Sequence, residues 1–438
     1  MSSEFLHIIK IPGNNLSDLE AFYSSSYLKE AITGLIKGEI SRIKVQDRKV
    51  LLKPNWVLHS IRYADRFCMR TNDSFVIAVL GIILEMGPSA VIIGDAPVQG
   101  CKWDIVISES FKDSLNRLSS EYGIPVWIRD FRRRTYSVID NKPRTDVRPL
   151  SDYVIFDIGD KSMLEPVTES GPTKFRVTNY DPDRMSLAHS TGMHKYCIAR
   201  ELFEADLIIS LPKIKTHQKT GLTGALKNIV GINGDKDFLP HHRIGGAGRR
   251  GDCYPGKSYL RYWSERLLDN ANRKQGRKSF WYWQKCSSLL WRLSLPGPEH
   301  HISAGWYGND TTWRMVMDLN QIVYYGRSDG NLYPTRQREV LALSDGIIAG
   351  QGNGPLYPEP LPLGVILFSN NPALHDIAAT TLMGLDFRKF RLLTEASCFF
   401  GNNSPDITLN GEQVVITDLI RNSVNAEPPI GWKSYLSH

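Results

Sequence analysis

The residues best suited to chemistry gather in one stretch, from Leu211 to Gly231. It combines cationic side chains with glycines and a threonine, namely Lys213, Lys215, His217, Lys219, Gly221, Thr223, Gly224 and Lys227. A buried chain tolerates so many cations only when an anion offsets their charge. Glycines let a ligand approach the backbone, and exposed amides before a helix favour anions. The stretch predicts an anion site, and a solvated basic loop is the alternative. The glycine–lysine spacing of a P-loop is missing.

Residue types suggest roles within this stretch. His217 suits proton transfer, because imidazole titrates near neutral pH. Lys227 suits a covalent anchor or a fixed cation facing an oxyanion. We expect the remaining polar residues to bind the anionic group of the substrate, namely Lys213, Lys215, Thr223 and Asn228.

Four further polar residues lie at the ends of apolar segments elsewhere in the chain. Lys53 is the last residue of the segment KVLLK, Asn55 comes two residues later, and Asp95 follows AVIIG. Asp345 precedes a glycine-rich stretch, GIIAGQGNGP, which reads as an adaptable loop. We expect these four residues to complete the substrate pocket. A proline turn after the first strand and a helix N-cap at Asp95 are the alternatives. Asp376 is expected in the first turn of a helix, where the dipole favours a carboxylate.

Short apolar strands alternate with helical stretches in the first half of the chain. The expected strands are Lys49–Lys53, Ala90–Gly94, Pro125–Ile128 and Asp206–Leu211, and the expected helices are Asp73–Met86 and Ser108–Tyr122. Later strands are expected at Val340–Leu343, Gly346–Ala349 and Leu363–Phe368, before a helix at Leu374–Met383. The alternation predicts an α/β fold, a mostly parallel sheet with helices on both faces. Ligands of such sheets bind outside the carboxyl ends of the strands.

Two segments interrupt this pattern. Residues 130–188 are an irregular or β-rich excursion, and residues 241–305 are a basic, aromatic, helical insertion. The α/β body of the catalytic type then comprises 1–240 and 306–438. The net charge is +7, of which His241–Leu295 contributes +9 (twelve basic and three acidic residues), so the rest of the chain carries −2. Because a nucleic-acid-binding surface would spread further, nucleic acid is not the expected partner.

The insertion reads as two amphipathic helices joined by a basic turn, Asn272 to Lys278. Four of the ten tryptophans lie within it, at positions 263, 281, 283 and 291. A hairpin that packs on the body or on a second subunit through 258–295 is the simplest interpretation. Aromatic residues beside Lys and Arg also suit an anionic membrane surface. Single-stranded nucleic acid is a third alternative.

Composition limits the class of protein. The apolar fraction of 42% and the charged fraction of 23% are those of a globular chain, which excludes disorder and collagen-like repeats. The longest apolar run, Val76–Ile93, is broken at Glu85 and Gly87, and the N-terminus lacks the features of a signal peptide. We therefore expect a cytoplasmic protein, peripheral at most to a membrane. The six scattered cysteines predict reduced thiols and no iron–sulfur cluster within the chain.

Four motifs together resemble one known family. They are KPNW, GDAP, LPKIKTHQKTGLTGALKNIVGI and DGIIAGQGNGP with NPALHDIAATTLMGLD, between Lys49 and Asp386. On these motifs the chain is identified as a member of the family called domain of unknown function 362. Many relatives in that family carry a ferredoxin-like iron–sulfur segment, and this chain lacks the clustered cysteines for one.

The stretch Asp206–Gly231 is also similar to the core of nickel-dependent lactate racemase. In that family a histidine acts as acid/base, and a lysine ten residues later anchors a nickel pincer cofactor. His217 and Lys227 have that spacing. The resemblance implies that a metal could bind, with His241 or His242 as candidate ligands, although their offset differs. Adjacent histidines point in different directions, so at most one is expected to be a ligand.

The leading hypothesis is an enzyme that acts on a small anionic substrate by proton or hydride transfer. A hydroxy acid, an acidic sugar or a phosphorylated metabolite would fit, and a racemase, epimerase, dehydratase or redox step would suit the residues. The alternative is a non-catalytic protein that binds an anion or cofactor and docks on a membrane as part of a biosynthetic assembly.

Overall fold

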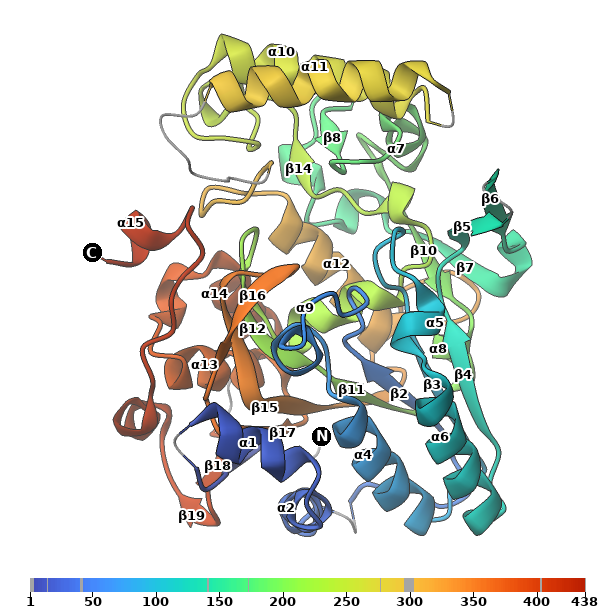
Figure 1. Cartoon of the computed structure of the whole chain (residues 1–438), viewed down its shortest axis with the longest axis vertical. Helices are drawn as coiled ribbons and strands as arrows, with labels where there is room; N and C mark the ends of the chain where they lie inside the picture. The colour runs from blue at the N-terminus through green and yellow to red at the C-terminus, as the bar shows by residue number, and fades with distance from the viewer. Residues whose placement is uncertain are drawn as a thin grey trace.

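The computed structural model describes residues 4–13, 15–39, 42–139, 142–171, 173–275, 277–294, 303–401 and 404–437. A large twisted sheet crosses the molecule in the order β19-β18-β1-β17-β15-β11-β2-β3-β4 (Figure 1). One half of it is parallel and comprises β15 (Glu339–Asn353), β11 (Leu207–Leu211), β2 (Lys49–Pro54), β3 (Ala90–Asp95) and β4 (Val126–Asp130).

The other half of the sheet is mixed. Strand β17 (Val365–Ser369) runs antiparallel to both β15 and β1 (Phe5–Lys10). Strand β18 (Asp406–Leu409) is parallel to β1, and β19 (Glu412–Gln413) closes the edge as a hairpin. The expected α/β class with a mostly parallel central sheet is confirmed.

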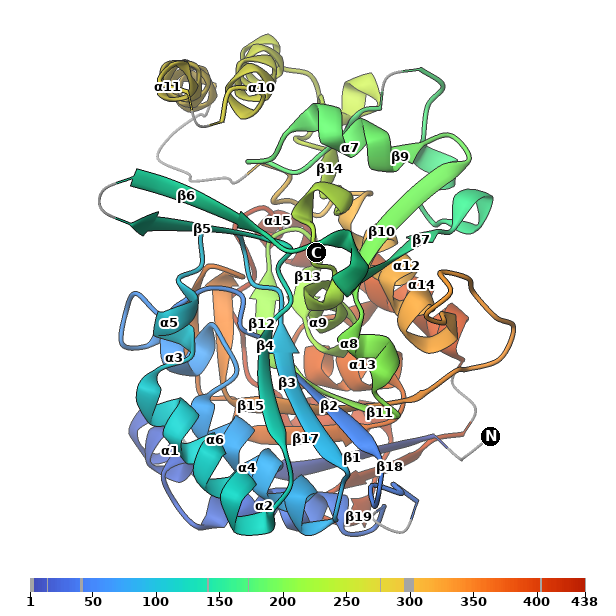
Figure 2. The same cartoon turned by 90° about the vertical axis from the view of Figure 1, so that its right-hand side faces the viewer.

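Helices cover both faces of the sheet because successive strand residues point to opposite sides. On β2, Val50 and Leu52 enter one core, whereas Leu51 enters the other. The first core packs beneath α1 (Leu16–Tyr23), α2 (Tyr27–Ile36), α4 (Asp73–Glu85) and α6 (Glu109–Tyr122). The second packs beneath α9 (Ala225–Asn228), α12 (Thr312–Tyr325), α13 (Pro372–Leu382) and α14 (Arg391–Phe400). Figure 2 shows the two groups on opposite sides of the strands. Short helices α5 (Trp103–Val106), α8 (Glu201–Glu204) and α15 (Lys433–Leu436) complete the body.

Two stretches that we expected to be loops are strands. Lys213–His217 forms β12, which pairs with β13 (Gly221–Thr223) in a hairpin. The two strands expected at 340–343 and 346–349 are one strand, β15, which continues through the glycine-rich stretch to Asn353. Pairing explains the continuity, because β17 pairs as far as Gly346 and β16 (Tyr357–Leu361) pairs from Ala349 onward. The glycines in this stretch do not indicate that β16 and β17 pair with it.

Residues 130–188 contain the expected β-rich pieces. Strands β5 (Arg134–Ile139) and β6 (Lys142–Val147) form a hairpin, and β7 (Tyr153–Asp157) pairs with β10 (Met193–Ala199). Strand β10 also pairs with β9 (His189–Ser190), which follows α7 (Pro182–Ala188). The short strand β8 (Phe175–Arg176) pairs with β14 (His242–Arg243). The excursion and the insertion are therefore joined by a β-ladder.

The expected helical hairpin is confirmed as α10 (Tyr259–Asn272) and α11 (Ser279–Leu293). The two helices lie side by side at one end of the molecule, beyond β8, β14 and α7 (Figures 1 and 2). The end of the insertion, at 295–302, lies outside the described residues, and the domain boundaries at 240 and 306 stay a prediction.

One helical stretch, Asp65–Glu85, is long and apolar enough to cross a membrane, and 78% of its most apolar window is buried inside the protein. It comprises α3 (Asp65–Cys68) and α4, which packs against the central sheet. The six cysteines are free thiols.

Candidate functional site

A cavity of about 320 Å³ opens at the carboxyl ends of the parallel strands. We call it the strand-end cavity. Its polar lining comes from the ends of β2 and β3, from the β12–β13 hairpin, from α9 and from the segment that follows α9, and comprises Asn55, Asp95, Lys215, His217, Lys219, Thr223, Lys227, Asn228, Lys236 and His241. Val177–Tyr180 in the excursion and Pro355 and Leu356 also line it. The topology thus brings together residues that are far apart in the sequence, as expected for this class of sheet.

Most of the residues expected at the site line this cavity, but four do not. Lys213 lies on β12 beneath the surface and pairs with Asp345 at 2.9 Å. Tyr23 contacts both, because its hydroxyl donates to Asp345 at 2.5 Å and accepts from Lys213 at 3.1 Å. Lys53 is buried behind Asp95, and His242 faces away from the cavity into the root of the hairpin. Charge pattern alone could not separate paired lysines from those that face the cavity.

Asp95 and Asn228 are held by neighbours rather than free to bind a ligand. Asp95 accepts from Lys53 Nζ at 2.7 Å, from the Trp56 amide at 2.6 Å and from the Ala96 amide at 2.9 Å. Asn228 accepts from Lys53 Nζ at 3.2 Å and donates to the Lys53 carbonyl at 3.0 Å. This network fixes the floor of the strand-end cavity. A side chain at Gly231 would collide with Asp95, because its Cβ would lie 1.8 Å from Oδ1.

Four lysines around the cavity lack an acidic partner. Within the described residues, no carboxylate lies within 4.0 Å of the Nζ atoms of Lys215, Lys219, Lys227 and Lys236. Lys215 Nζ instead donates to Asn55 Oδ1 at 2.9 Å and to the Met69 carbonyl, and Lys236 Nζ donates to the Ala96 carbonyl at 2.7 Å. These contacts satisfy the hydrogen-bonding capacity of the Lys215 and Lys236 ammonium groups but do not neutralise their positive charges.

Burial lowers the pKa of each of these lysines. The pKa of Lys227 falls to about 7 through burial first, and then through the charges of Lys236, Lys219 and Lys53. Burial likewise lowers the pKa of Lys215 to about 7, and those of Lys219 and Lys236 to about 8. At neutral pH the cavity therefore contains amines poised between the charged and the neutral form, which is typical of functional sites.

His217 is locked into one tautomer by the turn that follows β12. Its Nδ1 accepts the amide hydrogens of Lys219 at 3.0 Å and Thr220 at 3.2 Å. Since Nδ1 accepts, the ring proton belongs on Nε2. Burial, followed by the charges of Lys227 and Lys215, holds the pKa of His217 well below its usual range. The neutral ring is therefore a hydrogen-bond donor through Nε2, and the geometry disfavours Nε2 as a proton acceptor.

His241 has the opposite tautomer. Its Nδ1 donates to the Leu239 carbonyl at 2.7 Å, which leaves the lone pair on Nε2. Burial and the charge of Lys219 hold the pKa of His241 well below its usual range. The cavity thus contains one neutral histidine that donates and one that accepts. Thr223 adds a hydroxyl that is buried and has no hydrogen-bond partner within the described residues.

Asp376 stabilises this site from a distance. It lies in the second turn of α13, not in the first turn as expected, because α13 begins at Pro372. Its carboxylate accepts the amide hydrogens of Ala225 at 2.6 Å and Leu226 at 3.0 Å. It therefore caps the N-terminus of α9, the helix that carries Lys227, and Gly224 is required there because a Cβ would lie 2.1 Å from Asp376 Oδ1.

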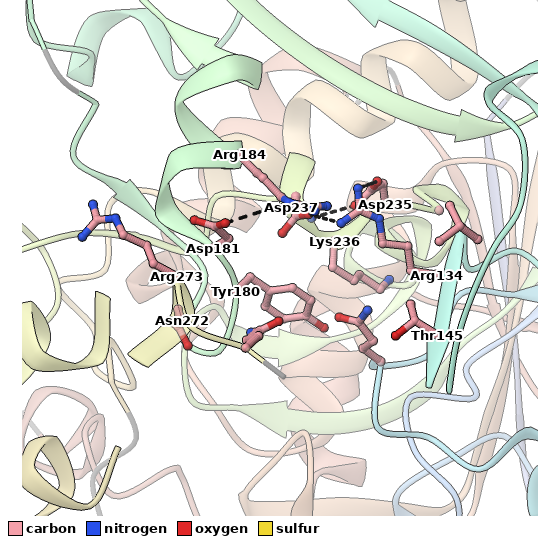
Figure 3. Close-up of a pocket in the computed structure, with 14 residues that line it drawn as sticks. Arg134, Thr145, Tyr180, Asp181, Arg184, Asp235, Lys236, Asp237, Asn272 and Arg273 are labelled. Atoms are coloured by element: carbon pink, nitrogen blue, oxygen red, sulfur yellow. Dashed lines mark hydrogen bonds and ion pairs between the residues drawn. The ribbon is translucent and has the colours of Figure 1, made fainter. Parts of the chain in front are cut away.

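A second cavity of about 390 Å³ adjoins the first, and both include Tyr180 and Lys236 (Figure 3). Its charges are largely paired. Arg134 contacts Asp237 at 3.1 Å, and Arg184 contacts the same carboxylate at 3.3 Å. Burial and the neighbouring Asp235 raise the pKa of Asp237 to about 7. The compensated charges make this cavity a weaker candidate for anion binding than the strand-end cavity.

Sequence reasoning missed part of the cavity lining. Lys219 stood in the motif but was not assigned to the site, and Lys236 follows the motif in a turn with two aspartates. Val177–Tyr180 lies in the excursion, where no pattern indicated proximity to the strand ends. Lys236 stands between Asp235 and Asp237 in the sequence, but its Nζ turns inward and donates to the Ala96 carbonyl at 2.7 Å.

The fold and the cavity define a class, an α/β protein with a cavity lined by lysines and histidines at the ends of its parallel strands. The family model described as "Domain of unknown function (DUF362)" matches residues 159–381. The chain belongs to this family, as its motifs indicated. The matched region contains β12, α9 and α13, whereas the KPNW and GDAP motifs lie outside it. The resemblance to lactate racemase stays a prediction.

Two similar proteins provide context. A thylakoid-associated protein of Synechocystis is 22% identical over 213 residues, which are 49% of this chain and 41% of that protein. A protein of Thermotoga maritima with a crystal structure gives a TM-score of 0.35 at 10% identity, covering 85% of this chain and 57% of that one. The chain thus spans well under two thirds of the length of either protein.

Proposed function

We propose that this protein is an enzyme that binds a small anionic substrate in the strand-end cavity and moves a proton or hydride on it. The observation that carries the proposal is a group of four lysines, the buried Lys215 and Lys219 and the half-buried Lys227 and Lys236, without carboxylate partners among the described residues. Burying uncompensated charge is costly, and an anionic ligand removes that cost. A hydroxy acid, an acidic sugar or a phosphorylated metabolite has the required charge and fits a volume of about 320 Å³.

The tautomers suggest a division of roles. His217 would donate a hydrogen bond from Nε2 to an oxygen of the substrate, while His241 would accept a proton at Nε2. Lys227, with a pKa of about 7, could exchange a proton or attack a carbonyl as a neutral amine. Lys215 and Lys219 would hold the anionic group, and Thr223 would donate its unpaired hydroxyl.

Binding is tested first. Isothermal titration calorimetry with inorganic phosphate and a panel of 2-hydroxy acids should give saturable binding to the wild type. Lys227→Met and Lys215→Met should each weaken it at least tenfold, because each removes a cation that faces the ligand. Lys37→Met, at an exposed position, is the matched control. Absence of saturable binding by every anion would contradict the proposal.

Catalysis is tested by hydrogen exchange. Incubation of each bound anion in D₂O, followed by NMR, reports proton transfer at carbon without knowledge of the product. We expect exchange with at least one anion and its loss in His241→Asn. Binding without exchange or turnover in the whole panel would favour the alternative, a non-catalytic anion- or cofactor-binding protein.

We propose as a second function that the α10–α11 hairpin docks on an anionic membrane surface. The hairpin carries eight basic and two acidic residues between positions 259 and 293, a net charge of +6. Large apolar side chains stand exposed on it, including Trp263 at 58%, Trp281 at 63% and Leu293 at 65%. Exposed aromatic rings among cations are typical of interfacial helices. The name of the Synechocystis relative, which says that it is thylakoid-associated, supports this proposal.

Flotation with vesicles of phosphatidylcholine and phosphatidylglycerol tests the docking. We expect the wild type to float with anionic vesicles and to be released by salt, because screening weakens the attraction. Trp263→Ser combined with Trp281→Ser should abolish flotation, whereas Trp127→Ser, an exposed position on β4, should not. Equal flotation of the double variant would contradict docking through the hairpin.

A further inference from the structure

A second group of potential ligands lies at the root of the hairpin, away from the strand-end cavity. It comprises His242 of β14, Cys253 of the following loop and Glu265 of α10. Each offers a donor atom, and these atoms all lie within 4.8 Å of one another. All three residues are buried. An imidazole, a thiol and a carboxyl group rarely gather in a protein interior without a shared partner.

Two of these side chains have unused hydrogen-bonding capacity. Glu265 Oε2 accepts the amide hydrogen of Gly245 at 2.9 Å, but Oε1 has no partner within the described residues. Nδ1 of His242 also has no hydrogen-bond partner within the described residues. His242 Nε2 lies 3.9 Å from Glu265 Oε1, too far for a hydrogen bond. Buried polar groups left in this state call for an explanation, such as an ion between them.

The distances and the space suit a single metal ion. Zn²⁺ lies about 2.0–2.3 Å from nitrogen, oxygen and sulfur ligands, so atoms 3.9 Å apart can share one ion. A small cavity of about 10 Å³ lies beside His242, Glu265 and Ser303. That is room for about one water or ion. Ser303 also contacts Cys253, with Oγ 2.8 Å from Sγ.

The charges also suit a divalent cation. A thiolate and a carboxylate together carry two negative charges, which Zn²⁺ neutralises. Nearby Arg176 is already paired with Asp269 at 3.0 Å.

We propose that His242, Cys253 and Glu265 bind one Zn²⁺ that fastens the hairpin to the body of the protein. One nitrogen, one sulfur and one oxygen ligand leave the fourth tetrahedral position to water. The site links β14 to α10 and is distinct from the strand-end cavity, because His241 faces that cavity and His242 faces the hairpin root.

Metal content and cobalt spectroscopy test this site on the full chain. After dialysis against Zn²⁺ and then buffer, we expect one zinc per wild-type chain by mass spectrometry. Substitution with Co²⁺ should give the ultraviolet charge-transfer absorption of a cobalt–thiolate bond. Cys253→Ser should lose that absorption, and Cys253→Ser and His242→Ala should lose bound zinc. Cys398→Ser, an exposed thiol, should retain both signals.

Two outcomes would overturn the proposal. The first is a wild-type chain that retains no zinc after loading, which would leave an apo cluster of protonated side chains. The second is zinc that survives in Cys253→Ser and His242→Ala but disappears in His241→Ala, which would place the ion in the strand-end cavity. The cobalt spectrum of the wild type shows whether a thiolate binds the metal even where a variant does not fold. A variant that fails to fold is replaced by Glu265→Gln.

Discussion

At the residue scale, the buried lysines fall into two kinds. Lys53 and Lys213 each pair with a carboxylate, Asp95 and Asp345. Lys215 and Lys227 face the strand-end cavity, and neither pairs with a carboxylate in the part of the chain that the structure describes. The sequence could predict that cations crowd together, but the pairing depends on which strands are neighbours. Asp345 reaches Lys213 only because β12 lies beside β15. The unpaired lysines, not the whole motif, therefore make the site.

Anion binding should depend on pH through these unpaired lysines. Their pKa values, about 7 for Lys215 and Lys227, should return toward the usual 10.5 when an anion binds. Binding then takes up protons above pH 7. We expect phosphate affinity to be highest near pH 6 and to fall up to about tenfold per pH unit for each proton taken up above pH 7. Calorimetry in buffers of different ionisation enthalpy measures the uptake, and its absence would exclude charged lysines as ligands.

Removing the half-buried cation of Lys227, which has no carboxylate partner among the described residues, should stabilise the unliganded fold. Because the pKa of Lys227 is lowered on folding, its charge opposes folding fully below pH 7, and the penalty disappears as pH rises toward 10.5. Lys227→Met should raise the free energy of unfolding by roughly 3 kcal/mol at pH 6 and by much less at pH 10. Urea unfolding at both pH values measures this. Stabilisation of the unliganded protein together with loss of anion binding would be a trade-off between stability and function.

At the element scale, most strands and helices could be predicted because their hydrophobic periodicity is local. The helix at 73–85 and the strands at 90–95 and 207–211 are confirmed within two residues at their ends. The predictions of secondary structure were wrong where pairing with strands far away in the sequence determines the structure. Lys213–His217 reads as a polar loop, yet β13 and β15 make it a strand whose residues are all buried. The charged side chains of this strand gave no sign that its backbone pairs on both sides.

The short helix α9 depends on its cap. Asp376 from α13 accepts both of the first amide hydrogens of α9, and α9 carries Lys227 into the cavity. Asp376→Ala should lower the free energy of unfolding by about 1–3 kcal/mol, since two buried amides lose their acceptor. It should also weaken phosphate binding, although Asp376 is absent from the cavity lining. Chemical denaturation and calorimetry measure the two effects.

A matched control is Asp113→Ala, at an exposed position of α6. Substitutions at such surface positions change stability little, so both measurements should stay near the wild-type values. If Asp376→Ala were stable and bound phosphate normally, the cap would not hold α9 in place.

At the scale of the whole molecule, the hairpin and the cavity share a wall. The segment Val177–Tyr180 lines the strand-end cavity, and the C-terminal end of α10 holds its backbone. Asn272 Nδ2 donates to the Thr178 carbonyl at 3.1 Å, and Gln275 Nε2 donates to the Asn179 carbonyl at 2.8 Å. The ladder between β8 and β14 fixes the start of the same segment. The excursion and the insertion, whose sequences show no relation to each other, thus together form one wall of the strand-end cavity.

This arrangement predicts that the hairpin tunes the cavity without touching the ligand. Asn272→Ala removes the hydrogen bond to Thr178 and should loosen the wall, which raises the entropy lost on binding. We expect the dissociation constant for phosphate to rise severalfold and amide exchange at residues 177–180 to accelerate. Trp281→Ser, on the exposed face of α11, should leave both unchanged.

Because coupling is reciprocal, a vesicle that holds the hairpin still should tighten phosphate binding in the wild type but not in Asn272→Ala. Equal phosphate affinity with and without vesicles would show that docking and the cavity are energetically independent.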